Sequence, residues 1–125
     1  MTVVLIVEDD EQVRVLAESY LQEQGHQTVS AATADEALAA LDATEHVDLL
    51  FTDIGLHGDI HAGLELAKRA VARRPELKVL YTTGQGVTDG LAALFVKGSA
   101  VLPKPYTVDQ LQGMLANWFG ITPSA

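Results

Sequence analysis

Short apolar runs alternate with amphipathic stretches along the whole chain, and this alternation restricts the possible folds more than any other feature. The first run, VVLIV at 3–7, is continuous and rich in β-branched residues, as expected for a parallel strand buried on both faces. Four more strands are predicted at 28–31, 47–52, 79–82 and 100–102. Strands that alternate with helices predict an α/β domain built around a parallel sheet.

The stretches between the strands carry the start and stop signals of helices. Gly25 can end the first helix. Thr33 with Glu36 predicts a capping box at the start of the second helix, and Thr107 with Gln110 predicts another at the start of the last one.

Two further helices are predicted between these. One runs from 62 to 74 and is stopped by Pro75, and a shorter one near 90–97 follows a glycine-containing loop. The apolar spacing of the first and last helices predicts inner faces that consist of Val13, Leu16, Ala17, Tyr20 and Leu21 in the first and of Val108, Leu111, Leu115, Trp118 and Phe119 in the last.

Length and composition exclude several classes of protein. Five strands and five helices fill all 125 residues, so we expect one domain over residues 1–125. No apolar run is long enough to cross a bilayer, the N-terminus lacks the pattern of a signal peptide, and no cysteine is available for disulfides or thiolate metal sites. We therefore expect a cytoplasmic protein without a membrane partner, and Met1 directly before the first strand suggests a natural start.

The net charge of −9 argues against nucleic acid as a direct partner, because such binding depends on neutralising phosphates. One basic cluster occurs in the stretch AKRAVARR. It can be a dedicated anion site, but a solvated helix face with cations near the C-terminal end, where they suit the helix dipole, is the simpler interpretation. The cluster consists of Lys68, Arg69, Arg73 and Arg74.

Polar side chains follow four of the five predicted strands. In open parallel sheets, ligands bind beyond the carboxyl ends of the strands, at the point where the strand order reverses. If the strands are parallel, we expect these carboxylates, a hydroxyl and an ammonium to meet at one edge of the sheet. The residues are Glu8, Asp9 and Asp10 after the first strand, Asp53 after the third, Thr83 after the fourth and Lys104 after the fifth.

Several carboxylates in one small site raise each other's pKa or require a counter-ion. Mg²⁺ suits such a site, because it prefers hard oxygen ligands and keeps several waters. With an ammonium and a hydroxyl nearby, the arrangement favours phosphoryl transfer, in which a protein mainly positions groups and neutralises charge. A carboxylate can then act as the nucleophile and form an aspartyl phosphate.

The segments VVLIVEDD, DLLFTD, VLYTTG and LPKPY resemble, in order and spacing, the motifs of CheY-like response-regulator receiver domains. The resemblance covers nearly the whole chain. It implies a flavodoxin-like doubly wound (βα)5 sandwich with a parallel five-stranded sheet of order 2-1-3-4-5. It also implies a receiver of a two-component or phosphorelay system, phosphorylated by a histidine kinase or a histidine phosphotransfer protein, that signals to a downstream protein.

The resemblance assigns a role to each polar residue at the predicted edge. Asp53 resembles the phosphoacceptor, Thr83 the switch hydroxyl, and Lys104 the lysine that pairs with the acceptor or the phosphoryl group. The peptide bond before Pro105 is expected to be cis. The Mg²⁺ ligands that the resemblance implies are Glu8, acting through water, and Asp9, Asp53 and the main-chain carbonyl of Gly55.

Several neighbouring residues have simpler interpretations. Asp10 suits the N-cap of the first helix better than the metal site. Thr82 points to the face opposite Thr83, because side chains alternate along a strand. His57 and His61 could suggest a transition-metal site, but solvated loop histidines are favoured because no further ligand completes a set.

One position departs from the receiver pattern. Val101 stands where many receivers carry an aromatic residue that rotates on phosphorylation. We hypothesise that the signal travels instead through the loop at 83–90 and the following helix, because the glycines there leave few constraints. The stretch YTTGQG resembles in part the threonine-glycine motif of certain stand-alone alphaproteobacterial receivers. The output surface is expected on the last two helices and the strand between them, although Leu94, Phe95 and Val96 can equally be core residues.

Three alternatives remain at this stage. A Mg²⁺-dependent phosphatase like the haloacid dehalogenases would need a second aspartate two residues after Asp53, where Gly55 stands. A receiver fold used only for binding would not need the acidic pair, acceptor, threonine and lysine. Excision from a hybrid kinase is the third possibility. We expect a receiver that catalyses its own phosphorylation and dephosphorylation and has no separate enzymatic output.

Overall fold

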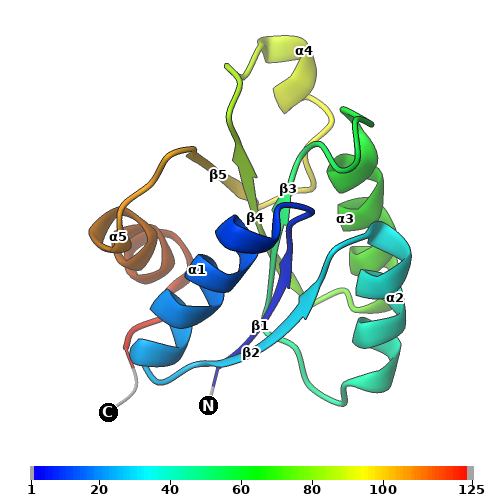
Figure 1. Ribbon diagram of the computed structural model, residues 1–125. Helices are drawn as coiled ribbons and strands as arrows, with labels where there is room; N and C mark the ends of the chain where they lie inside the picture. The colour runs from blue at the N-terminus through cyan, green and yellow to red at the C-terminus, as the bar shows by residue number, and fades with distance from the viewer. Residues whose placement is uncertain (1, 124–125) are drawn as a thin grey trace.

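The computed structural model describes residues 2–123, whose five strands form one parallel sheet with helices on both faces (Figure 1). Met1, the suggested natural start, lies outside the described residues. The strand order is β2-β1-β3-β4-β5, which confirms the predicted doubly wound fold. The strands are β1 (Val3–Val7), β2 (Gln27–Ala31), β3 (Leu49–Asp53), β4 (Lys78–Thr83) and β5 (Ala100–Pro103).

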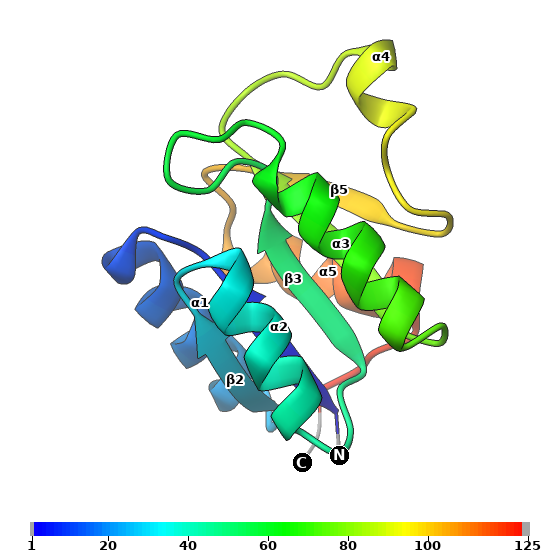
Figure 2. The same ribbon diagram turned by 90° about the vertical axis from the view of Figure 1, so that its right-hand side faces the viewer.

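The helices divide into two layers. In Figure 1, α1 and α5 cover one face of the sheet and α2 and α3 cover the other, and Figure 2 looks onto the α2–α3 face. The short helix α4 projects beyond the edge of the sheet in both views. The helices are α1 (Glu11–Glu23), α2 (Ala34–Ala43), α3 (Ala62–Arg73), α4 (Asp89–Ala92) and α5 (Val108–Phe119). None of the helices between residues 2 and 123 has the length and apolarity needed to span a membrane.

Strand β1 is an interior strand of the sheet, because it pairs with β2 on one side and β3 on the other. All five of its residues are buried, as its uninterrupted apolar sequence predicts. Val4 and Ile6 belong to the core beneath α1 and α5, whereas Leu5 and Val7 belong to the core beneath α2 and α3. Packing on both faces therefore fixes the position of the residues that follow β1.

The register of the sheet brings the ends of β1 and β3 together. Val7 pairs with Thr52, so Glu8 and Asp53 leave the sheet side by side. On the other side of β3, Asp53 pairs with Thr82, and the backbone N–H of Lys104 donates to the carbonyl of Thr83 at 2.8 Å. All four strand ends that carry polar residues thus lie at one edge.

The prediction of burial is wrong for two residues, Leu16 and Trp118. Leu16 is 50% exposed and Trp118 is 58% exposed. The inner face of α5 is formed by Leu111, Leu115 and Phe119, and the indole N–H of Trp118 donates to the carbonyl of Gly98 at 3.0 Å on the surface. Helical spacing predicts Leu16 and Trp118 on the inner faces of their helices, but the stripe of each helix that is buried is narrower than this spacing suggests.

One helix start and one helix length differ from expectation, whereas a second helix start is as predicted. The capping box at Thr107 and Gln110 is confirmed. At the start of α2 only half of a box forms, because the carboxylate of Glu36 accepts from the N–H of Ala32 instead of the N–H of Thr33. The helix predicted near 90–97 shortens to α4, since Phe95 and Val96 turn inward to pack against the core.

The basic cluster on α3 has a structural role at two of its positions. Arg73 forms an ion pair with Asp42 of α2 at 2.6 Å. Arg74 donates to the carbonyls of Leu41 and Thr44, both at 2.6 Å. These carbonyls lie at the C-terminal end of α2, where backbone acceptors lack partners within the helix. The two arginines therefore tie α3 to the end of α2.

Candidate functional site

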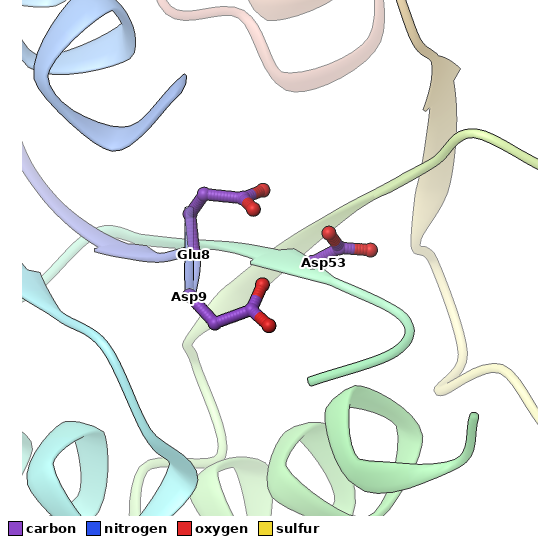
Figure 3. A group of neighbouring side chains, drawn as sticks. All are labelled: Glu8, Asp9 and Asp53. Carbon is purple, nitrogen blue, oxygen red and sulfur yellow. The ribbon is translucent and has the colours of Figure 1, made fainter. Parts of the chain in front are cut away.

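Three carboxylates converge at the edge of the sheet, as their positions after β1 and β3 predict. One oxygen each from Glu8, Asp9 and Asp53 lies within 4.8 Å of the other two. Figure 3 shows the three side chains extending from neighbouring backbone segments toward a common space. Glu8 is 4% exposed, whereas Asp9 is the most exposed of the three. A partly enclosed cluster of carboxylate oxygens results.

Lys104 is the cation that faces this cluster. Its Nζ lies 2.7 Å from Oε2 of Glu8 and 2.6 Å from Oδ2 of Asp53. The peptide bond between Lys104 and Pro105 is cis, as expected. Burial lowers the pKa of Lys104, but the hydrogen bonds to Asp53 and Glu8 outweigh burial and raise the pKa above its ordinary value. The ammonium therefore stays charged and joins the strand ends of β1, β3 and β5.

The surroundings of Glu8 and Asp9 shift the pKa values of these two acids in opposite directions. Burial raises the pKa of Glu8 to about 6, although the hydrogen bond from Lys104 acts in the opposite direction. Burial also acts to raise the pKa of Asp9, but this effect is outweighed by the N–H of His57 and by a hydrogen bond with Glu8, and the pKa falls below its usual range. Three carboxylates facing one ammonium leave the ionised site with net negative charge, which favours a cation.

The donor atoms of the cluster fit a hard divalent ion. The three donors are all carboxylate oxygens, and the group contains no histidine or other nitrogen donor among residues 2–123. Oxygen-only sets of this kind suit Mg²⁺ better than Zn²⁺ or Cu²⁺. Gly55 lies beside the cluster, because its N–H donates to Oδ1 of Asp53 at 3.3 Å. The role of the Gly55 carbonyl as a ligand stays a prediction.

The two threonines at the end of β4 have different surroundings. The hydroxyl of Thr82 is buried and donates to the carbonyl of Leu102 at 2.7 Å, so it is engaged within the sheet. The hydroxyl oxygen of Thr83 accepts from the N–H of Gln85 at 3.1 Å. Thr83 also lines, with Asp53, a cleft of about 730 Å³. Thr82 is the sheet partner of Asp53, but it is Thr83 that shares the cleft with Asp53.

This cleft extends from Asp53 between the β3–α3 loop and the β4–α4 segment. Five of the residues that line it are glycines, which contribute backbone and no side chain to its wall. Ile60, which is 62% exposed, and Leu94, which is 38% exposed, also line it. Asp53 thus lies at the wall of an open cleft. The five glycines are Gly55, Gly58, Gly84, Gly86 and Gly90.

The remaining acidic and histidine residues lie outside the cluster. Asp10 is the N-cap of α1, as predicted, and its carboxylate accepts from the N–H groups of Gln12 and Val13. His57 is exposed, as a solvated loop histidine should be, but it also contacts two neighbouring loops, which the sequence did not predict. His61 precedes α3 without capping it through its side chain.

The sequence also failed to indicate where an aromatic ring lies near Val101. Val101 pairs in the sheet with Tyr81 of β4, whose side chain is fully buried. The ring of Tyr81 packs on Phe95 at a centroid distance of 4.7 Å, and its hydroxyl accepts from the N–H of Val96 at 3.2 Å. Phe95 and Val96 are therefore tied to the core, and of the three apolar residues at 94–96 only Leu94 is exposed.

Known proteins are similar to this chain in sequence. The family model of the response regulator receiver domain matches residues 4–116. The nitrogen assimilation regulatory protein NtrX of Azorhizobium caulinodans is 32% identical over 109 residues, which are 86% of this chain and 24% of that protein. The DNA-binding transcriptional regulator NtrC of Salmonella typhimurium is also 32% identical, over 86% of this chain and 23% of its own length. The chain thus spans about a quarter of the curated relatives it matches.

Solved structures agree with these matches. NtrX from Brucella abortus, solved in complex with ADP, is 30% identical and superposes with a TM-score of 0.83 over 96% of this chain and 27% of that chain. A CheY-like receiver domain protein from Methanospirillum hungatei is 28% identical, with a TM-score of 0.79 over 94% of this chain and 92% of that one. The chain therefore belongs to the response regulator receiver domain family of two-component signalling systems.

Proposed function

We propose that Asp53 accepts a phosphoryl group from a phosphohistidine on a histidine kinase or a histidine phosphotransfer protein. One observation carries the proposal: the carboxylate of Asp53 touches the ammonium of Lys104 at 2.6 Å and shares a cluster with Glu8 and Asp9. An isolated carboxylate needs no such surroundings. A nucleophile that acquires a phosphoryl group needs cations on both sides, because negative charge accumulates on the phosphoryl oxygens.

The proposed transfer is a displacement at phosphorus. A carboxylate oxygen of Asp53 forms the new O–P bond while the P–N bond of the phosphohistidine breaks, and the electron pair of that bond stays on the imidazole nitrogen. The products are an aspartyl phosphate and a free histidine on the donor. The cleft beside Asp53 and Thr83 would offer the donor an approach, because it has a volume of about 730 Å³ and Asp53 itself lines it.

The residues around Asp53 have complementary tasks. Glu8, Asp9, Asp53 and the carbonyl of Gly55 would hold Mg²⁺, which supplies positive charge against the phosphoryl oxygens when bound. Lys104 lies between Glu8 and Asp53, so its ammonium can contact a phosphoryl oxygen without leaving the site. The oxygen of Thr83 accepts one hydrogen bond and still has its own O–H to donate to the phosphoryl group.

We also infer that residues 1–125 act as a receiver domain in the cytoplasm without a separate enzymatic output. The domain would promote its own phosphorylation and dephosphorylation, and its output would be contact with another protein. The exposed apolar side chains of Trp118 on α5 and of Leu94 after α4 support this view, at 58% and 38% exposure. A phosphatase of the haloacid dehalogenase type is less well supported, since Gly55 provides no second carboxylate.

The test is intact-mass analysis after incubation with acetyl phosphate and Mg²⁺. Wild type should gain one phosphoryl group when Mg²⁺ is present and none with EDTA. Asp53→Ala should gain none, whereas Asp109→Asn, at an exposed aspartate in the first turn of α5, should label like wild type. Equal labelling of wild type and Asp53→Ala would refute the assignment, and continuous turnover of small phosphomonoesters would favour the phosphatase.

A further inference from the structure

We propose that His57, at the tip of the β3–α3 loop, is a positioning residue that orients the carboxylate of Asp9 for Mg²⁺. This inference rests on the proposed function, because it takes the cluster of Glu8, Asp9 and Asp53 as the metal site. It adds a residue that no strand end indicates and whose side chain does not reach the cluster.

The loop tip is a tight two-residue turn. Leu56 and Asp59 exchange both backbone hydrogen bonds at 3.0 Å, which leaves His57 and Gly58 between them. His57 has φ of 51° and Gly58 has φ of 80°. Two-residue hairpin turns with positive φ at both central positions favour Asn-Gly or Gly-Gly, and an L residue such as histidine adopts this conformation at a cost of about 1 kcal/mol. The contacts of His57 explain why it is held there.

His57 connects three loops at the edge of the sheet. Its backbone N–H donates to Oδ2 of Asp9 at 3.0 Å. Its ring Nε2 lies 3.0 Å from the carbonyl oxygen of Ala32 and must donate to it, because a carbonyl can only accept. Ala32 is itself held, since its N–H donates to the carboxylate of Glu36 in the first turn of α2. The tip is therefore anchored on the β2–α2 loop and delivers an N–H to Asp9.

Asp9 gains most from such a contact, because it is the most exposed carboxylate of the cluster. An exposed side chain samples several rotamers and loses that freedom when it binds a metal. A hydrogen bond formed before the metal arrives removes part of this loss. A carboxylate has about four lone-pair positions, so the N–H of His57 and a metal can share it.

The same loop positions a second proposed ligand. Gly55 lies two residues before His57, and its N–H donates to Oδ1 of Asp53 at 3.3 Å. Leu56, between them, is only 3% exposed and anchors the loop in the core beneath α2 and α3. The segment from Gly55 to His57 is thus held at both ends and in the middle. Release of the tip should loosen Asp9 directly and the Gly55 carbonyl indirectly.

The test is the Mg²⁺ affinity of the unphosphorylated chain, measured by isothermal titration calorimetry. His57→Pro removes the backbone N–H and cannot adopt positive φ. His57→Gly keeps the N–H, can adopt positive φ and removes only the imidazole ring. We expect the dissociation constant for Mg²⁺ to rise about tenfold in His57→Pro and about two- to threefold in His57→Gly. Val15→Ala, a change at a 50% exposed residue of α1, should leave it unchanged.

A second measurement does not depend on the proline variant. The amide proton of His57 should be protected from hydrogen exchange in wild type and lose that protection in Asp9→Ala, because its acceptor is gone. Unchanged exchange, or equal Mg²⁺ affinity in wild type and a folded His57→Pro, would overturn the inference. Failure of wild type to label at Asp53 would instead refute the proposed function, and the Mg²⁺ titration would still report on His57.

Discussion

Gly63 lies so close to the backbone of Asp53 that a β-carbon on Gly63 would come within 1.8 Å of the Asp53 carbonyl oxygen. The N–H of Gly63 also donates to the carbonyl of Ile54 at 2.7 Å. The first turn of α3 is therefore pressed against the end of β3, from which the proposed acceptor extends. A side chain at position 63 would have to push this turn away from the site.

Gly63→Ala should accordingly lower the free energy of unfolding by about 3 kcal/mol, because the added methyl group meets rigid backbone. It should also slow labelling of Asp53 by acetyl phosphate. Gly113→Ala is the matched control, since its nearest neighbour would be the amide of Asn117 at 4.0 Å. In the middle of α5 this change should stabilise the protein by about 1 kcal/mol. Urea unfolding checks both values. Equal stabilities of wild type and Gly63→Ala would contradict the close packing of Gly63 against Asp53.

Lys104→Met should destabilise the metal-free protein at pH 7 by about 2 kcal/mol, because it leaves the carboxylates of Glu8 and Asp53 without their cation. Mg²⁺ should recover part of the loss by supplying positive charge. Lys97→Met, at an exposed lysine, should change the stability little. Urea unfolding with Mg²⁺ and with EDTA distinguishes these results, and a Lys104→Met loss that is indifferent to Mg²⁺ would argue against a shared site.

Glu8 should make the metal-free protein less stable as the pH rises. Its pKa is about 6 in the folded protein against 4.5 in the unfolded chain, so the folded state binds more protons between these values. This contribution favours folding below pH 4.5 and is lost as the pH rises through about 6. It amounts to about 2 kcal/mol. In EDTA, the free energy of unfolding should fall with rising pH in wild type and not in Glu8→Gln. Parallel pH profiles of the two proteins would contradict the role of Glu8.

His26 should have the opposite effect on pH dependence. It is 4% exposed, and neither ring nitrogen has a hydrogen-bond partner among residues 2–123. Burial lowers its pKa from 6.5, so the unfolded chain binds the proton more readily. Stability is therefore lost as the pH falls below 6.5. His26→Leu should keep more of its stability at pH 5 than wild type does, and a wild-type acid profile in this variant would show that His26 is not responsible.

A phosphoryl mimic such as beryllofluoride should slow amide exchange between Gly84 and Leu91, because Thr83 at the start of this segment would bind the mimic. Val101 has no ring that could rotate. The hydrogen bond from the N–H of Val96 to the hydroxyl of Tyr81 therefore holds the segment after α4 against the sheet. Tyr81→Phe should remove this bond and speed exchange at Val96 several-fold, corresponding to about 1 kcal/mol. Exchange mass spectrometry tests both effects, and exchange that the mimic leaves unchanged would exclude this route for the signal.

Local signals in the sequence predicted the alternating strands and helices, whereas the strand order was implied by the resemblance to receiver domains. A short apolar run rich in β-branched residues such as VVLIV favours a buried strand, and the residues after it then emerge at the carboxyl edge. Parallel pairing then brings Glu8 and Asp53 together without any knowledge of side-chain contacts. The caps at Asp10 and Thr107 were equally predictable, since a cap depends only on the next three residues.

Periodicity was less informative about the depth of burial. Leu16 and Trp118 have the spacing of core residues but are exposed, because the width of a buried stripe depends on how closely the helix approaches the sheet. The length of α4 was unpredictable for a related reason. Phe95 leaves the helical path to pack on Tyr81, a residue of another strand.

The sequence by itself determined the type and order of the strands and helices, and the reactive groups that reach one edge. Only the tertiary structure decided which atoms meet: Lys104 bonds Glu8 across a separation of 96 residues, and His57 bonds Asp9 across 48. Hydrogen bonds require donor and acceptor to approach within about 3 Å, and that distance depends on the packing of every element between them. Local patterns carry no information at that precision.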